Sequence, residues 1–169
     1  MKIKTKFTAL IVAFLITTVG LSQEKKVASP AETVKGKING ADVTIMYGSP
    51  SVKGRTIWGE LVPFDAVWRA GANDATMFIT DKPLTVEGQK LPAGKYSLFV
   101  IPNQKETTII FNRVAKQWGA YDYDEKKDQL RVKVKPLAKS DTTERLNYTV
   151  NKDNVTLSWE KWNIVIPIK

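Results

Sequence analysis

Short segments in which apolar and polar residues alternate recur along the chain, and this period of two constrains its fold more than any other feature. The expected strands are residues 34–38, 41–47, 76–80, 84–86, 96–101, 107–111, 130–135, 146–150, 155–159 and 162–168. Turn signals separate them at roughly 8–12 residues, a spacing typical of sandwiches and barrels. We therefore predict an all-β fold, an antiparallel β-sandwich of the jelly-roll or immunoglobulin-like kind.

Two places in this pattern also indicate how strands pair. Asn39-Gly40 is a strong signal for a two-residue hairpin, which would join the first two expected strands. The segment 96–101, YSLFVI, is apolar on both faces except at Ser97, which predicts a central strand buried on both sides. Its expected antiparallel neighbour is the segment 107–111.

A basic stripe runs along one face of the segment 130–135, formed by Arg131, Lys133 and Lys135. Such a stripe usually faces solvent and protects a sheet from edge-to-edge association. The alternative is a docking surface for an acidic polymer.

The N-terminus has the features of a secretory signal peptide. Lys2, Lys4 and Lys6 precede an uncharged apolar stretch at 7–21, and small residues stand before a cut after Ser22. We predict a signal peptide at 1–22, a flexible lead at 23–33 and a single β-sandwich domain at 34–169. The protein is then exported, to the periplasm or beyond the cell, with no transmembrane segment left after cleavage.

The composition of the chain excludes several kinds of catalytic and metal site. The chain has no cysteine and no histidine, so it lacks the commonest zinc ligand and the Ser–His and Cys–His nucleophile pairs. Its net charge is +9 at pH 7, which suits an anionic partner such as an envelope glycan. Export argues against a nucleic-acid partner.

Residues 47–74 interrupt the alternation for an unusually long connection. The stretch is too rich in large apolar residues to be disordered, so we expect it to fold onto the sheet, anchored by Trp58 and Trp68. Residues 57–61 and 64–68 are each expected to form a short helical turn.

Four runs are together specific: YGSPSVKGRTIWG, PFDAVWRAGANDATMF, LPAGKYSLFVIP and WEKWNIVIPI. In these runs the chain resembles the secreted bacterial family catalogued as domain of unknown function 2911, found largely in Bacteroidota. The resemblance covers almost all of the chain after the signal peptide. It implies export and a single domain, and it implies no activity and no catalytic residues.

Arg69 is the first candidate for a binding residue. Asp65 precedes it by four residues, a spacing that suits an ion pair on a helical turn. The alternative is a guanidinium presented to a carboxylate or phosphate of a ligand. Asn73 and Asp74 either cap a turn before the next strand or line a cleft together with Arg69.

Arg55 is the second candidate. It follows tight turns at 49–51 and at Gly54, and consecutive exposed amides in such turns can hold an anion. The glycine spacing and the terminal Lys-Ser/Thr of a phosphate-binding P-loop are absent.

The loop QWGAYDYDEKKD, residues 117–128, alternates aromatic and acidic residues. Tyr121 could stack on a sugar while Asp122 accepts hydrogen bonds from the sugar hydroxyls. The alternative is a hairpin loop whose aromatic side chains pack against the protein and hold it in place. Its acids could also hold calcium, but the glycine at position six and the glutamate at position twelve are missing. We predict no metal and no cofactor.

Taken together, these patterns predict a ligand- or partner-binding module of the cell envelope, for a glycan or a small anionic ligand. The alternatives are a glycan-active hydrolase that uses carboxylates, and a structural envelope component without a site. The predicted binding residues are Arg55, Trp58, Asp65, Trp68, Arg69, Asn73, Asp74, Tyr121 and Asp122.

Overall fold

The computed structural model describes residues 28–169. The predicted signal peptide and residues 23–27 of the predicted lead lie outside this range. The strands are β1 (Ala31–Ile38), β2 (Ala41–Gly48), β3 (Thr76–Thr80), β4 (Leu84–Val86), β5 (Gln89–Leu91), β6 (Gly94–Ile101), β7 (Thr107–Asn112), β8 (Asp128–Val134), β9 (Pro136–Val150) and β10 (Asn154–Pro167), with one 3-10 turn, η1 (Glu125–Lys127). In the described part of the chain, no helix has the length and apolar character to span a membrane.

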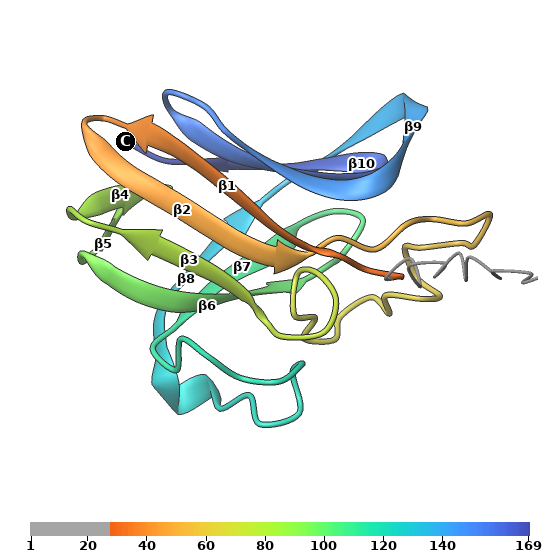
Figure 1. The fold of residues 1–169 in the computed structure, drawn as a ribbon, viewed down its shortest axis with the longest axis horizontal. Coiled ribbons are helices and arrows are strands. Elements are labelled where there is room, and N and C mark those ends of the chain that lie inside the picture. The colour runs from red at the N-terminus through yellow and green to blue at the C-terminus, as the bar shows by residue number, and fades with distance from the viewer. Residues whose placement is uncertain (1–27) are drawn as a thin grey trace, which may run out of the picture.

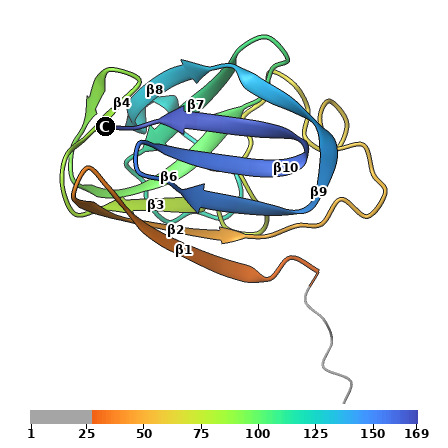
Figure 2. The same ribbon diagram turned by 90° about the horizontal axis from the view of Figure 1, so that it is seen from above.

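The molecule is an antiparallel β-sandwich of two unequal layers (Figure 1). One layer is a six-stranded sheet in the order β1-β2-β3-β6-β7-β8, and the other is the long β9–β10 hairpin. Figure 2 shows the hairpin lying across the inner face of the sheet, while β4 and β5 form a small hairpin at one end. The predicted all-β antiparallel sandwich is confirmed.

The predicted hairpin turn and central strand are also confirmed. Asn39 and Gly40 both have positive φ, 48° and 77°, which is the backbone of the tight turn whose twist matches two paired strands. β6 lies between β3 and β7, and most of its side chains are buried. β1 begins at Ala31, so residues 31–33, expected in the lead, belong to the sheet.

β10 contains an irregularity that reverses which residues face the core. Val155 and Trp159 are buried before it, at odd positions, whereas Ile164 and Ile168 are buried after it, at even positions. The pairing with β9 shifts on both sides of Glu160, whose φ is +51°. From the Ser158–Asn147 pair to the Trp162–Ala138 pair, β10 advances by four positions and β9 by nine. Such an irregularity exchanges the two faces of the strand, which is why the alternation in β10 reads as two separate strands.

The main core lies between the two layers, and a smaller one lies on the outer face of the six-stranded sheet. The smaller core consists of Ala75, Phe99 and Ile110, with Ala120 and Tyr123 packed against it. The loop that supplies Ala120 and Tyr123 therefore covers part of this outer face.

The long connection between β2 and β3 folds onto the sandwich, as predicted. Ser51 forms a bridge with Arg145 of β9, and Trp68 forms a bridge with Val100 of β6. The predicted helical turns at 57–61 and 64–68 are wrong, because these residues form turns and isolated bridges. Asp65 has a φ of +59°, which an α-helix does not allow.

Candidate functional site

Residues 67–75, which we call the corner, leave the long connection and enter β3. Trp68 exchanges two backbone hydrogen bonds with Val100, of 2.8 and 2.9 Å, so the corner starts as an added piece of sheet. Ala70 and Asn73 both have positive φ, 54° and 64°. Such backbone is held only where its surroundings fix it.

Two buried hydroxyls hold the corner at Ala70. The carbonyl oxygen of Ala70 accepts hydrogen bonds from Thr76 Oγ1 at 2.9 Å and from Tyr148 Oη at 2.8 Å. Because Tyr148 belongs to β9, this contact ties the corner to the opposite layer of the sandwich. Burial raises the pKa of Tyr148 above its ordinary value of 10.0.

We expect Tyr148→Phe to lower the free energy of unfolding by about 1 kcal/mol at pH 7, since one net hydrogen bond is lost and Thr76 still serves the carbonyl. Above pH 10 the unfolded phenol ionises while the buried one keeps its proton, so wild-type stability should fall as pH rises. The variant should fall less steeply. Urea unfolding at pH 7, 9 and 11 measures both effects, and an equal decline in the two proteins would contradict the assignment.

A second segment, residues 116–121, crosses the corner, and we call it the crossing segment. Ala75 N donates to Gln117 O at 3.0 Å, and Gly119 N donates to Asn73 O at 3.1 Å. Gln117 is buried, and its Nε2 donates to Ser97 Oγ of β6 at 3.0 Å. The crossing segment is thus fixed to both the corner and the sheet, and a hollow lies at each end of this pairing.

The first hollow, which we call the Arg69 hollow, has a volume of about 310 Å³. Its lining residues are Val67, Trp68, Arg69, Ala120 and Tyr121. Arg69 Nε is buried without a hydrogen-bond partner, and no carboxylate within residues 28–169 lies within 4.0 Å of the guanidinium. Tyr121 is 80% exposed at the rim. The hollow therefore combines an uncompensated cation with aromatic surface.

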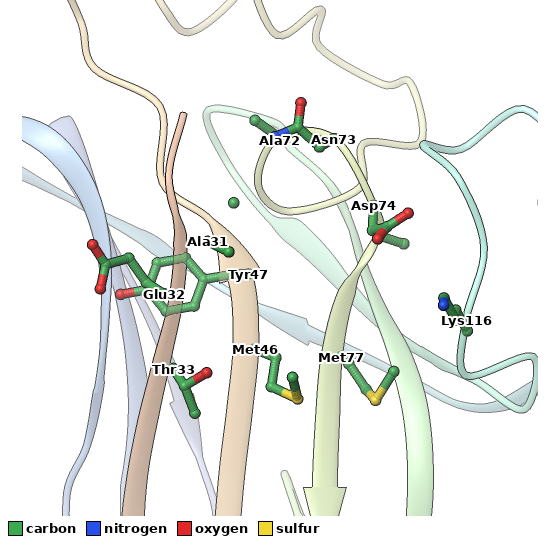
Figure 3. A pocket seen from close by; sticks show the side chains of 12 residues that line it. Ala31, Glu32, Thr33, Met46, Tyr47, Ala72, Asn73, Asp74, Met77 and Lys116 are labelled. Carbon is green, nitrogen blue, oxygen red and sulfur yellow. The ribbon is translucent and has the colours of Figure 1, made fainter. Parts of the chain in front are cut away.

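The second hollow, which we call the methionine hollow, is larger, at about 410 Å³. It lies on the outer face of β1, β2 and β3, between this face and the corner (Figure 3). Its lining residues are Ala31, Glu32, Thr33, Met46, Tyr47, Gly48, Ala72, Asn73, Asp74, Ala75, Met77 and Lys116. Two acidic residues, Glu32 and Asp74, and one basic residue, Lys116, contribute charge to a mainly apolar surface.

Glu32 and Tyr47 also line the methionine hollow, but they belong to the core-facing side of β1 and β2, where they are direct partners in the register. Figure 3 shows the Glu32 carboxylate beside the Tyr47 ring, away from the two methionines. Burial raises the pKa of Tyr47, the hydrogen bond from the Tyr148 backbone lowers it, and the charge of Glu32 raises it further. The Tyr47 ring also packs edge-on against Tyr148, with centroids 4.8 Å apart.

The structure divides the predicted site residues between these two hollows and the rest of the molecule. Trp68, Arg69 and Tyr121 line the Arg69 hollow. Asn73 and Asp74 line the methionine hollow, where the Asn73 amide also donates to Ser29 O at 3.2 Å. The cleft that was expected to hold Arg69 and Asn73 together is therefore two separate hollows.

The other predicted residues lie outside both hollows. Arg55 donates to the carbonyls of Val52 and Ser51, at 3.0 and 2.6 Å, so its guanidinium closes its own turn. Asp65 accepts from the Asn103 amide at 2.8 Å, and it forms no ion pair with Arg69. The expected Asp65–Arg69 pair is thus wrong.

Trp58 and Asp122 also fall outside the two hollows. Trp58 is buried and belongs to the core, where its ring stacks on Trp162 with centroids 4.7 Å apart. The prediction of Trp58 as a ligand-binding residue is therefore wrong. Asp122 is exposed, and it lines neither hollow.

The acidic residues of the loop 117–128 are mostly committed to protein contacts. Asp128 accepts from Tyr123 Oη at 2.6 Å and from the Asn112 amide at 2.8 Å, while Asp124 Oδ1 caps the turn η1 through Lys126 N at 3.0 Å. Burial, followed by the bond to Asp128, raises the pKa of Tyr123. Within residues 28–169, no three acidic side chains gather as a metal site would require.

Sequence reasoning missed Met46, Met77 and Lys116. The signal for the methionines was present: Met46 stands between Ile45 and Tyr47, so it points away from the core side of β2. What was missing was the register of β2 against β3, which places Met77 directly opposite Met46.

Comparison with known proteins identifies the family. The model of the family described as "Protein of unknown function (DUF2911)" matches residues 29–168. The chain belongs to this family. The match covers almost all of the described chain, so both hollows of this DUF2911 protein lie inside the family domain. No curated protein and no solved structure matches the chain.

Proposed function

We propose that this DUF2911 protein is an exported binding module that holds an acidic sugar, such as a uronate unit of an envelope glycan, in the Arg69 hollow. The observation that carries the proposal is the Arg69 guanidinium, which lines a hollow and has no carboxylate partner among residues 28–169. An uncompensated cation beside apolar surface attracts an anionic group more strongly than one in open water.

The chemistry of the hollow selects a carboxylate on a flat, partly apolar body. A guanidinium can meet a carboxylate with two parallel hydrogen bonds, which fixes the orientation of the ligand. Trp68 and Tyr121 provide aromatic surface beside it, and Tyr121 is exposed enough to lie against a sugar ring. Without the three lysines of residues 1–22, 23 basic residues stand against 17 acidic ones, and the remaining net charge of +6 favours the approach of an acidic glycan.

The hydrolase alternative is not favoured by this geometry. Retaining and inverting glycosidases place two carboxylates across one cleft. Asp65 is bonded to Asn103, and of the candidate acids Asp65, Asp74, Asp122 and Asp124 only Asp74 lines either described hollow. The other carboxylate of the methionine hollow, Glu32, lies beside Tyr47 and does not face Asp74 (Figure 3). We therefore propose binding without turnover.

Arg69→Ala tests the proposal. Calorimetric titration with a glucuronate-containing oligosaccharide should show binding to the wild type, weakened roughly 10- to 100-fold in the variant, since hydrogen bonds to charged groups contribute about 1.5–3 kcal/mol. The neutral oligosaccharide of the same length should bind much more weakly to the wild type. Arg69→Lys keeps the positive charge but cannot form the two parallel hydrogen bonds of a guanidinium. Its affinity should therefore lie between that of the wild type and that of Arg69→Ala.

Arg55→Ala is the matched control, because it removes the same charge from a guanidinium that serves its own turn. Its affinity for the acidic oligosaccharide should equal that of the wild type. An equal loss of affinity in both alanine variants would show that net charge alone explains the effect, and it would contradict the proposed binding site. Absence of binding to the wild type would overturn the ligand class.

A further inference from the structure

The methionine hollow contains two thioethers from neighbouring strands. Met46 of β2 and Met77 of β3 are direct partners in the antiparallel register. Both line the hollow, and Figure 3 shows their side chains on the same side of the sheet. Met46 is 45% exposed, so an ion in solvent can reach this place.

Methionine is an unusual choice at these two positions. The solvent-facing side of a sheet favours β-branched and aromatic residues, and the row that contains the pair continues through Thr33 on one side and Ser97 on the other. The chain has only three methionines, and the third is Met1. Both internal methionines therefore lie opposite each other in one hollow.

The thioethers are also the principal soft donors of the chain. With no cysteine and no histidine, sulfur ligands come only from methionine. A thioether is neutral and polarisable, and it binds Cu(I) and the similar ion Ag(I) in preference to hard divalent ions. The oxygen groups that line the hollow, including Asp74, would favour hard ions only if several of them converged, and no such cluster occurs within residues 28–169.

We propose that Met46 and Met77 together bind one soft monovalent cation, Cu(I) or Ag(I), in the methionine hollow. Directly opposed residues of an antiparallel pair have Cβ atoms about 4.5–5.5 Å apart. Each side chain has three rotatable bonds, so both sulfurs can turn towards one ion between them. The Asp74 carboxylate on the hollow wall offsets the positive charge that Lys116 brings. This site is separate from the Arg69 hollow and does not depend on the proposed sugar.

Silver titration of the full chain tests this site directly. With methyl-¹³C methionine, one equivalent of Ag(I) in chloride-free buffer should shift the Met46 and Met77 signals together; these are the two methionines that remain after the proposed removal of residues 1–22. Calorimetry should give one site per chain. Cu(I) competition against a chromophoric chelator should give the same stoichiometry.

Met46→Leu and Met77→Leu provide the matched variants, because leucine keeps the apolar volume and removes the sulfur. We expect each single variant to weaken Ag(I) binding at least tenfold and the double variant to abolish the one-equivalent step. Wild-type binding by the double variant, or a shift of only one of the two methionine signals, would overturn the proposal.

The two proposed sites can fail independently. Arg69→Ala should bind Ag(I) as the wild type does, and the double leucine variant should bind the acidic oligosaccharide as the wild type does. Loss of Ag(I) binding in Arg69→Ala would overturn the assignment of the ion to the methionine hollow.

Discussion

Gly48→Ala is expected to destabilise the protein by about 3 kcal/mol or more, a large share of the about 5–15 kcal/mol by which a domain of ordinary stability is held folded. A Cβ at this position would lie 2.1 Å from the carbonyl oxygen of Ala72 and 2.9 Å from its carbonyl carbon. Both are backbone atoms, so no side-chain rotation can relieve the clash. The same residue accepts the hydrogen bond from Ala72 N at 3.2 Å, so any shift of the corner breaks a further contact.

Gly88→Ala separates this clash from ordinary backbone strain. Gly88 has a φ of +77° with no atom within 4 Å of its would-be Cβ, so alanine there should cost about 1–2 kcal/mol from conformation alone. Urea unfolding followed by circular dichroism compares the two. Equal losses would show that the corner moves away freely and that Gly48 is not needed for close approach.

Trp58→Ala should lower the free energy of unfolding by about 3–5 kcal/mol, the usual cost of removing a large buried aromatic ring. The Trp58 ring stacks on Trp162 and meets Trp68 and Trp159 edge-on, with centroids 5.6 and 6.1 Å away. Its Nε1 is buried and has no hydrogen-bond partner in the part of the chain that the structure describes, so the loss comes from packing and from the cavity left behind. Urea unfolding followed by circular dichroism avoids the change in tryptophan fluorescence.

Trp118→Ala is the control for this substitution. Trp118 has the same side chain but is 59% exposed on the crossing segment, so its removal should change stability by no more than about 0.5 kcal/mol. A loss as large as that of Trp58→Ala would mean that the crossing segment, rather than the aromatic cluster, sets stability. Trp58→Phe should recover part of the loss, since it keeps an aromatic ring in place.

The strands that could be predicted are those with one face in the core. In β8, Leu130, Val132 and Val134 are buried while Lys133 is exposed, so the alternation in the sequence is the alternation of the sheet. The basic stripe faces solvent: Lys133 pairs with Glu106, and Arg131 pairs with Glu125. Its interpretation as a protected outer face agrees with these contacts.

The first part of β9 could not be predicted by the same reasoning. β9 begins at Pro136, whereas the expected strand begins at residue 146. Within residues 136–145 no side chain is buried, so neither face leaves an apolar pattern in the sequence. These residues form a strand because they pair with β10, including Leu137 with Asn163 and Ala138 with Trp162. Tertiary pairing, rather than local pattern, decides this segment.

Local sequence pattern was enough to predict the strands that border the core, the tight turn at Asn39-Gly40 and the fact that the long connection is ordered. Each of these depends on neighbours close in the chain, through side-chain alternation or the backbone freedom of glycine. Three outcomes could be known from the folded molecule alone: Trp58 enters the core, Arg69 faces a hollow without Asp65, and Met46 lies opposite Met77. Those outcomes depend on how residues far apart in the chain meet, and an aperiodic connection of nearly thirty residues carries no pattern that sets this register.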